Sequence, residues 1–333
     1  MQLSSRAKSR DLAEGARILR YARSLIRLRR IRDDKTKNIT NMNFYHYCAI
    51  CTSNKTVLVK EYSEPHVYSL IRCKQCGLIF QHPLPSEAFL KKFYHQLYST
   101  KRGLSSTLNA YEQFHPEQEE ARINTIEKYI RGGTLLDIGA SSGFFLHQLS
   151  KHPNWKGYGV ELSISAVKKA KDDFGLEITH GDIFNPHIKN NFFDVITMFS
   201  VLEHIPHVHE TLDMVYKKLK PNGWLIFTVP NISSFEYAIY HLLKKDFPGF
   251  IFEHIYYFTP RAVDELLQQH KFALRRMTSR HHSHISLPSP RPLVGLPIYT
   301  AKLAFEYTGI GGLLQIGNIL SIYAQKKSDQ KNS

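Results

Sequence analysis

The sequence predicts an α/β protein whose main domain is a doubly wound, mostly parallel, seven-stranded sheet. Three observations predict it. Short apolar runs typical of buried strands alternate with helical segments from residue 131 onward. Small and acidic residues recur at the ends of these runs, where open parallel sheets bind their ligands. All four cysteines lie ahead of this pattern, between Cys48 and Cys76, and predict a small separate module.

Length and composition allow two folded units and exclude several classes of protein. The chain has 333 residues, of which 42% are hydrophobic and 22% charged, as in ordinary soluble proteins. It holds no apolar run of bilayer-spanning length and no apolar core of a secretory signal. Because no cysteine lies outside the segment 48–76, we expect no disulfide-stapled secreted fold and a cytoplasmic location.

The pattern divides the chain into five segments: a basic extension (1–43), a cysteine module (44–85), a helical connector (86–130), the α/β domain (131–280), and an insertion with a last strand and a polar tail (281–333). The net charge is +15, and much of it lies in the extension, which is rich in arginine. The extension is interpreted as a solvated, partly disordered tail, as a helix in weak contact with an anionic membrane surface, or as a transit peptide.

Strands of the α/β domain are predicted at Thr134–Asp137, Gly157–Glu161, Leu176–Thr179, Asp194–Phe199, Trp224–Val229, Phe272–Thr278 and Asn318–Ala324. Helices are predicted at Gly143–Ser150, between an N-cap at Ser163 and a stop at Gly175, at Val208–Leu219, and from Thr259-Pro260 onward. A turn at Pro221–Gly223 separates the third of these helices from the next strand.

Two Cys-x2-Cys pairs predict a metal site. Cys48 and Cys51 form the first pair, and Cys73 and Cys76 form the second. Such pairs present four thiolates to one tetrahedral zinc ion, as in zinc ribbons. A redox Cys-x-x-Cys motif and an iron–sulfur cluster are the alternatives. Four thiolates close the coordination shell, so the expected zinc is structural rather than catalytic.

The first strand of the domain ends in an acid, Asp137, and runs into a loop of small residues that holds Gly139, Ser141 and Gly143. Small residues let a ligand approach the backbone closely, and the start of a helix offers unpaired N–H groups. The three-glycine fingerprint of a dinucleotide fold fits poorly, because Ser141 and Phe144 stand at its second and third positions. The sequence therefore predicts a ligand without a pyrophosphate.

Acidic residues also follow the next two strands. Glu161 lies about twenty residues beyond the loop, where an acid accepts the hydroxyl groups of a ribose. Asp182 and Ile183 follow the third strand, where they could accept from an adenine amino group and cover its ring. S-adenosylmethionine carries a sulfonium and an ammonium group, so carboxylates suit it as a ligand.

Residues 131–280 resemble a class I S-adenosylmethionine-dependent methyltransferase, a family with a Rossmann-like fold. The resemblance rests on the runs LLDIGASSGFFL, GYGVELS, GDIF, FDVITMFSVLEHIPH and LKPNGWLIFTVPN. It implies that the cofactor contacts Asp137, Gly139, Ser141, Gly143, Glu161, Leu162, Asp182, Ile183 and Ser200. Ser141 stands where many relatives have glycine.

The cysteine module extends the resemblance. The run CKQCGLIFQHPLP at 73–85 and a helix with Tyr94 and Tyr98 look like the zinc-binding module found ahead of methyltransferase domains in sugar, polysaccharide and natural-product pathways. The tyrosine helix would cover the cofactor site or pack between the domains.

Two Glu-His pairs are candidates for the acceptor side. Glu203-His204 follows the fourth strand, and Glu253-His254 precedes an aromatic run. A histidine titrates near neutrality and can take the proton that an acceptor loses during methyl transfer. His204 and His254 are therefore predicted as a catalytic base or as acceptor-binding residues, with a structural role as the alternative.

These observations predict an enzyme that methylates oxygen or carbon in a small molecule or a glycan precursor. Nucleic acid is not the expected substrate, because the run after the fourth strand, Ser200-Val-Leu-Glu-His, differs from the Asn/Asp-Pro-Pro-aromatic motif associated with base amino groups. The alternatives are an RNA or protein methyltransferase that grips its substrate with the zinc module and basic tail, and a non-catalytic binding module. A monomer or a homodimer is expected.

Overall fold

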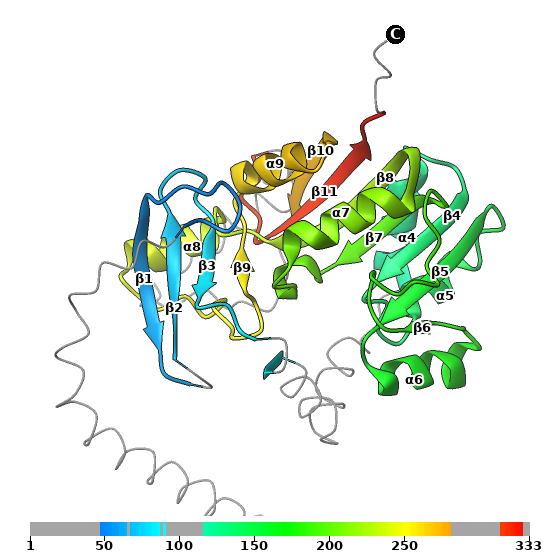
Figure 1. The fold of residues 1–333 in the computed structure, drawn as a ribbon, viewed down its shortest axis with the longest axis horizontal. Coiled ribbons are helices and arrows are strands. Elements are labelled where there is room, and N and C mark those ends of the chain that lie inside the picture. Colours follow the sequence, from blue (N-terminus) through cyan, green and yellow to red (C-terminus); the bar gives the residue numbers. More distant parts are fainter. Residues whose placement is uncertain (1–46, 65–66, 87–88, 91–115, 281–313, 329–333) are drawn as a thin grey trace, which may run out of the picture. The chain divides into compact units, whose positions relative to one another are not determined.

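The computed structural model describes residues 47–64, 67–86, 89–90, 116–280 and 314–328 (Figure 1). The predictions for the basic extension, for the helix with Tyr94 and Tyr98, and for nearly all of the proline-interrupted segment 281–316 lie outside the described residues. Within the described ranges, no helix combines the length and the apolar character that crossing a bilayer requires.

The main sheet has seven strands in the order β10-β11-β8-β7-β4-β5-β6. The strands are β4 (Gly133–Ile138), β5 (Trp155–Glu161), β6 (Thr179–His180), β7 (Phe193–Phe199), β8 (Leu219–Pro230), β10 (Phe272–Arg280) and β11 (Ile319–Lys326). Strands β4 to β8 pair in parallel, whereas β11 runs antiparallel to both β8 and β10. This confirms the predicted Rossmann-like, mostly parallel sheet.

Helices cover both faces of this sheet (Figure 1). The helices of the described residues are α4 (Pro116–Glu127), α5 (Phe144–Leu149), α6 (Ile164–Phe174), η2 (Leu202–His204), α7 (Val208–Lys218), α8 (Phe235–Leu242) and α9 (Pro260–Gln269). Of these, α8 packs with residues 68–79 of the cysteine module and not on the seven-stranded sheet. Apolar residues of α4 and α5 pack against one face, and those of α7 and α9 against the other. Three predicted helix ends are confirmed: the side chains of Ser163 and Thr259 cap α6 and α9, and Gly175 ends α6 at φ 67°.

Two local predictions differ from the structure. The strand expected at Leu176–Thr179 starts only at Thr179 and has two residues. The turn expected at Pro221–Gly223 lies inside β8, where Leu219 pairs with Phe193 but the next recorded pair on β7 joins Trp224 to Val195. The extra residues of β8 form a bulge, and the positive φ of Asn222, 60°, shows that the turn residues bend the strand without ending it.

The cysteine module forms a second, antiparallel sheet in the order β1-β2-β3-β9. Its strands are β1 (Thr56–Tyr62), β2 (Tyr68–Cys73), β3 (Ile79–His82) and β9 (Tyr256–Tyr257). The fourth strand comes from a distant part of the chain, because Ile79 pairs with Tyr257 and Phe80 with Tyr256. Pairing across such a sequence distance could not be read from the cysteine spacing, and it joins the module to the segment that carries His254.

Candidate functional site

The cofactor loop, Asp137–Gly143, connects β4 to α5 and contains two glycines with a left-handed backbone. Gly139 has φ 71° and Gly143 has φ 80°. A Cβ on Gly139 would lie 2.6 Å from Val201 Cγ2, and a Cβ on Gly143 would lie 2.9 Å from Leu176 Cδ1. Backbone conformation and close packing therefore both require glycine at these two positions.

Asp137 lies buried at the start of the loop. The residue is 4% exposed, and Thr197 Oγ1 donates a 2.6 Å hydrogen bond to its Oδ1. Burial raises the pKa of Asp137 to about 7, while the Thr197 hydroxyl and the positive charge of Arg122 act in the opposite direction. A cationic ligand beside the loop would favour the ionised carboxylate, because an opposite charge lowers the pKa of a carboxyl group.

Glu161, at the end of β5, fastens the cofactor loop to the sheet. Its Oε2 accepts the N–H of Ser141 at 2.9 Å, and its Oε1 accepts the N–H of Ser163 at 2.8 Å. Burial raises the pKa of Glu161, and these N–H groups counteract the rise. An ionised carboxylate offers about four acceptor positions, so Glu161 keeps capacity for ligand hydroxyl groups.

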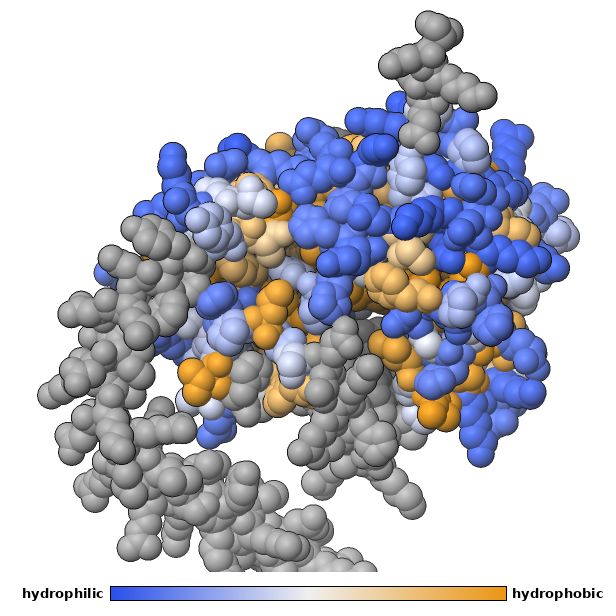
Figure 2. Space-filling view, in the orientation of Figure 1, coloured by the Kyte–Doolittle hydropathy of each residue, from blue (hydrophilic) through white to orange (hydrophobic). Residues whose placement is uncertain are grey.

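Apolar side chains are exposed at the ends of β5 and β6. Leu162 is 63% exposed and Phe184 is 44% exposed, and Figure 2 shows apolar residues at the surface around α6 and β6. The exposed Asp182 accepts the N–H of Phe184 at 2.9 Å, whereas Ile183 is only 2% exposed and belongs to the core. An apolar surface beside carboxylates suits a ligand with a flat ring and polar substituents.

The candidate histidines come together although fifty positions separate them in sequence. Their rings lie 4.9 Å apart, and one donor atom from each of Glu203, His204 and His254 lies within 4.8 Å of the others. We call these three residues the histidine site. Ser200, between β7 and this site, donates its N–H to Thr228 Oγ1 at 2.9 Å. The structure therefore brings both predicted histidines to one place beyond β7.

Burial dominates the electrostatics of the histidine site. It raises the pKa of Glu203, which is 2% exposed, to about 8, and it lowers the pKa of His204 to about 4. It also lowers the pKa of His254, and the neighbouring His204 adds to this effect. His204 Nδ1 lies 2.7 Å from the carbonyl oxygen of Glu253, so this nitrogen carries the proton and the lone pair is on Nε2. Both imidazoles are neutral at pH 7.

The cysteine module fixes the backbone around His254, one of the three residues of the histidine site. Gln81, on β3, is fully buried, and its Nε2 donates to the carbonyl oxygens of Phe252 at 2.6 Å and His254 at 3.1 Å. The backbone N–H of Gln81 is paired as well, because it donates to the carbonyl oxygen of Ile255 at 2.9 Å. Sequence analysis did not single out Gln81, because no motif marks a glutamine that fixes a remote loop.

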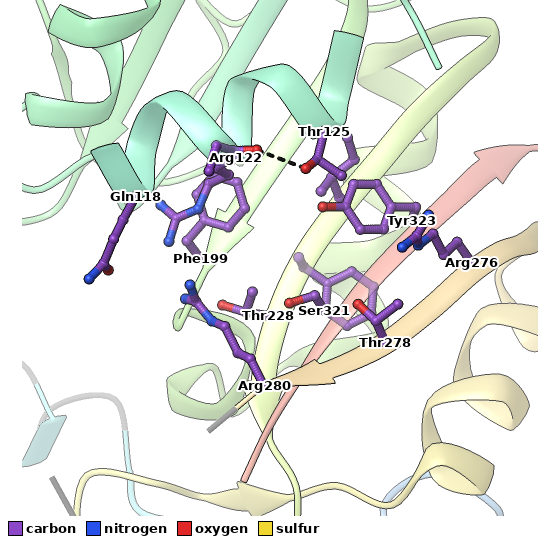
Figure 3. A pocket seen from close by; sticks show the side chains of 13 residues that line it. Gln118, Arg122, Thr125, Phe199, Thr228, Arg276, Thr278, Arg280, Ser321 and Tyr323 are labelled. Atoms are coloured by element: carbon purple, nitrogen blue, oxygen red, sulfur yellow. Dashed lines mark hydrogen bonds between the residues drawn. The ribbon is translucent and has the colours of Figure 1, made fainter. Parts of the chain in front are cut away.

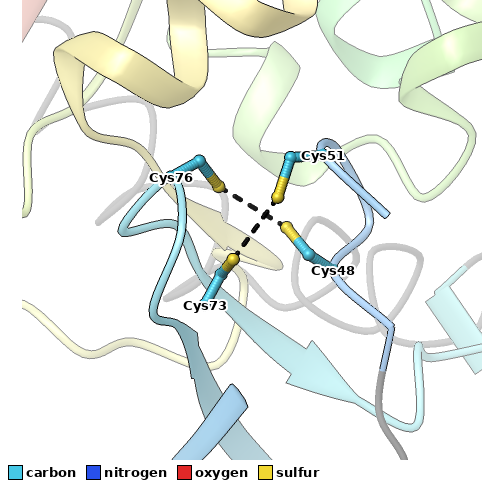
Figure 4. Close-up of side chains that lie close together, drawn as sticks. All are labelled: Cys48, Cys51, Cys73 and Cys76. Atoms are coloured by element: carbon cyan, nitrogen blue, oxygen red, sulfur yellow. Dashed lines mark hydrogen bonds between the residues drawn. The ribbon is translucent and has the colours of Figure 1, made fainter. Parts of the chain in front are cut away.

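The four cysteines form a candidate metal centre (Figure 4). Their sulfur atoms lie within 4.8 Å of one another, with Cys48 Sγ 3.6 Å from Cys76 Sγ and Cys51 Sγ 3.4 Å from Cys73 Sγ. Four sulfurs at the usual zinc–sulfur distance of about 2.3 Å would be about 3.8 Å apart in a tetrahedron, so the cluster fits zinc after a small expansion. The spacing-based prediction that these cysteines converge is confirmed.

The donor chemistry of the cluster also fits a cation. Burial raises the pKa of Cys51 to about 11, and the hydrogen bond to Cys48 together with burial raises the pKa of Cys76 further. A neighbouring thiol, that of Cys76, lowers the pKa of Cys48 to about 5. Four thiolates cannot share this buried space without a positive charge, and a metal ion deprotonates coordinating thiols.

Side-chain hydrogen bonds to backbone carbonyl groups connect the metal centre to the α/β domain. The Thr259 hydroxyl, which caps α9, also donates to the carbonyl oxygen of Cys76 at 2.5 Å. Gln269 Nε2 donates to the carbonyl oxygen of Ile50 at 2.9 Å. A Cβ on Gly77 would lie 2.9 Å from Thr259 Cγ2, so the second cysteine pair packs closely on the start of α9. The module is thus anchored at both ends of one helix.

A cavity of about 300 Å³ lies between α4 and the strands β7, β8, β10 and β11 (Figure 3). We call it the arginine pocket, because Arg122, Arg276 and Arg280 line it. Sequence analysis missed these residues. The signal was present on β10, where Arg276, Thr278 and Arg280 alternate and therefore share one face of the strand.

Comparisons with known proteins agree with this geometry. Residues 111–276 match the family described as a methyltransferase domain. An uncharacterized protein of Methanocaldococcus jannaschii is 31% identical over 123 residues, which cover 37% of this chain and 47% of that protein. A ubiquinone biosynthesis O-methyltransferase of Nitrosomonas europaea is 26% identical over 140 residues, which cover 38% of this chain and 59% of that protein. The chain thus spans about half the length of these curated relatives.

A solved structure with a similar fold is the 1,6-didemethyltoxoflavin-N1-methyltransferase of Burkholderia thailandensis, with bound 1,6-didemethyltoxoflavin and S-adenosylhomocysteine. The TM-score is 0.46 at 14% identity, and the similarity covers 81% of this chain and 100% of that chain. The family match and the mostly parallel sheet together lead to one assignment. Residues 111–276 of this chain are a class I S-adenosylmethionine-dependent methyltransferase domain.

Proposed function

We propose that the chain transfers the methyl group of S-adenosylmethionine to an oxygen or carbon atom of a small-molecule or glycan acceptor. The observation that carries this proposal is the position of Glu161, which holds the cofactor loop through Ser141 and keeps acceptor capacity for a ribose. The match of residues 111–276 to a methyltransferase family supports it. A relative named for O-methylation in ubiquinone biosynthesis supports a small acceptor.

The cofactor would be held at the carboxyl ends of β4, β5 and β6. Asp137 would face its positive charges, and Gly139, Ser141 and Gly143 would allow close approach of the methionine part. Glu161 would accept the ribose hydroxyl groups. The adenine would lie near Leu162, Asp182 and Ile183, with Phe184 as a further apolar contact, and Ser200 would border the methyl group.

Methyl transfer forms a bond between the acceptor atom and the methyl carbon while the sulfur–carbon bond breaks and its electrons return to sulfur. The acceptor must lose a proton, and Nε2 of neutral His204 or the ring of His254 would receive it. The imidazolium that results would lower the raised pKa of the neighbouring Glu203 carboxyl group, because an opposite charge favours the ionised form. Because the leaving group is already activated, the main work of the protein is to align the two reactants.

We further propose that Cys48, Cys51, Cys73 and Cys76 bind a structural zinc ion. The closed four-thiolate set leaves no position for a substrate, so the ion would cross-link the two cysteine pairs. Its effect on catalysis would be indirect, because the module that it stabilises carries Gln81, which holds the carbonyl groups of Phe252 and His254.

Methyl-labelled S-adenosylmethionine tests the proposed activity. The purified chain is incubated with the labelled cofactor and a fractionated cell extract, and the fraction that gains the label is identified. We expect a labelled small molecule or glycan precursor with the wild type and at least a tenfold lower rate with His204→Ala. Label in RNA or protein, or no transfer by a chain that binds the cofactor, would contradict the proposal. An unchanged rate in His204→Ala would exclude His204 as the base.

A further inference from the structure

The arginine pocket carries more positive charge than its surroundings neutralise. Arg122 Nη1 pairs with Glu119 Oε2 at 2.6 Å. No ion pair of Arg276 or Arg280 is recorded among the residues that the structure describes. The lining holds three guanidinium groups and no carboxylate, and Glu119 pairs with one of the three, so positive charge predominates around the cavity. An accumulation of like charge in a concave site is stabilised when an anion binds there.

Two of the three arginines point into the same part of the cavity, and the charges of all three influence Tyr323. Burial raises the pKa of the Tyr323 hydroxyl, and the charges of Arg122, Arg276 and Arg280 all counteract this rise. Partial desolvation lowers the pKa of the Arg280 guanidinium, although the residue as a whole is exposed, and the charge of Arg122 adds to the effect. Figure 3 shows Arg122 and Arg280 pointing toward the same part of the pocket. In the same view Arg276 lies on the other side of Tyr323, so Arg122 and Arg280 share one end of the cavity and Arg276 borders it farther away.

Hydroxyl groups complete the polar lining. Thr228, Thr278, Ser321 and Tyr323 line the cavity together with the arginines (Figure 3). Arginine forks and hydroxyl donors are the groups that proteins use to bind phosphoryl oxygens. A phosphate monoester carries a charge of about −1.5 to −2 at neutral pH, which matches the excess charge of the pocket better than a single carboxylate does.

The pocket lies beside the proposed reaction centre. Thr228, which lines it, accepts the N–H of Ser200, the residue that follows β7 ahead of the histidine site. On another side, the charge of Arg122 lowers the pKa of Asp137 in the cofactor loop, so this guanidinium is close to that carboxyl group. At about 300 Å³ the cavity is at the lower end of the range typical of ligand sites.

We propose that the arginine pocket binds a phosphoryl group of the methyl acceptor, so the acceptor is a phosphorylated small molecule. This inference rests on the proposed methyl transfer, because it names the substrate class of that same site. Arg122 and Arg280 would hold the phosphoryl oxygens, with Thr228 and Ser321 as further donors, and Arg276 would add positive charge at the other side of the cavity. The rest of the acceptor would extend toward Ser200 and the histidine site.

Titration calorimetry of the full chain at constant ionic strength tests the pocket. The probes are inorganic phosphate, succinate and, separately, S-adenosylhomocysteine. We expect saturable phosphate binding by the wild type, and about tenfold or greater weakening in Arg280→Gln, since one charge-assisted pair is lost. Arg275→Gln is the matched control: Arg275 is adjacent to Arg276 on β10, but its Nε donates to Gln325 at the surface. Its phosphate affinity should equal that of the wild type.

The outcomes separate this inference from the proposed function. An equal loss of phosphate affinity in Arg275→Gln and Arg280→Gln would show that phosphate is attracted by the general positive charge of the protein. This result would overturn the proposal that the arginine pocket binds it. Absence of saturable phosphate binding, or tighter binding of succinate than of phosphate, would also overturn it. Unchanged S-adenosylhomocysteine affinity in Arg280→Gln shows that the variant is folded. Failure of the wild type to bind S-adenosylhomocysteine would refute the methyl transfer, whatever the result with phosphate.

Discussion

The cofactor loop and the histidine site are built in different ways. The cofactor loop is local: its glycines, its acid and the carboxylate that fastens it lie within 25 consecutive residues, Asp137 to Glu161. The histidine site joins Glu203 and His204 to His254, and a glutamine of the cysteine module, Gln81, holds the second part. One region depends on backbone geometry within the sheet, and the other depends on the docking of a separate module.

This difference has a functional consequence. A site made of one strand–loop–helix unit keeps its geometry as long as the sheet folds, which suits a cofactor common to many enzymes. A site assembled from distant segments can change with the module that supports it, which suits a specific acceptor. Damage to the module should therefore affect methyl transfer much more than cofactor binding.

Loss of the metal centre should have the largest effect. The double variant Cys73→Ser/Cys76→Ser should contain no zinc, against about one ion per chain in the wild type. Methyl transfer should be abolished, because β3 and its Gln81 lose their support. S-adenosylhomocysteine affinity should stay close to that of the wild type. Metal analysis and calorimetry measure these quantities. A parallel loss of cofactor affinity would contradict the expectation that the cofactor loop folds independently of the cysteine module.

A change in the cofactor loop should reduce cofactor affinity and leave the metal centre intact. In Gly139→Ala the new Cβ would lie 2.6 Å from Val201 at φ 71°, so the loop must move. We expect roughly a 100-fold loss of S-adenosylhomocysteine affinity, equal to about 2.7 kcal/mol, with normal zinc content. Gly175→Ala is the control, since it has φ 67° but open space around its Cβ. It should cost about 1 kcal/mol of stability and leave cofactor affinity unchanged.

Loss of the hydrogen bonds that Gln81 donates to the backbone of Phe252 and His254 should have a smaller effect. Gln81→Leu leaves the carbonyl groups of Phe252 and His254 without their donor. We expect roughly a tenfold lower kcat, because small misplacement of a catalytic group is costly, and little change in cofactor affinity. Gln268→Leu, at the surface of α9, should behave like the wild type. A kcat for Gln81→Leu equal to that of the wild type would show that the module does not position the histidine site.

The smallest effect concerns the pH dependence of stability. Burial raises the pKa of Glu203 from 4.5 to about 8, so between these values the folded state holds a proton that the unfolded state has released. Stability from this group is complete below pH 4.5 and is lost as the pH rises to about 8. The Tm of Glu203→Gln minus that of the wild type should therefore rise by about 5 °C between pH 5 and pH 8.5. A constant difference in Tm over this range would refute the raised pKa.

Much of the α/β domain could be predicted from its sequence, because its signals are local. Ser163, Gly175 and Thr259 each mark the end of a helix that lies next to them in sequence. The cysteine pairs have the Cys-x2-Cys spacing of a metal site, and their sulfur atoms lie together. Long-range contacts could not be predicted in this way. Nothing near Tyr256 indicates that it pairs with Phe80, and the convergence of Arg122 with Arg280 depends on how α4 crosses the sheet.

Calorimetric titration of Glu161→Gln with S-adenosylhomocysteine tests the central claim most directly. The amide keeps the size of the side chain but has one acceptor oxygen, so it cannot hold Ser141, Ser163 and a ribose together. We predict that affinity falls roughly 10- to 100-fold relative to the wild type, while Glu177→Gln, a surface residue paired with Lys171, binds normally. Wild-type affinity in Glu161→Gln would contradict the assignment of this carboxylate to the cofactor.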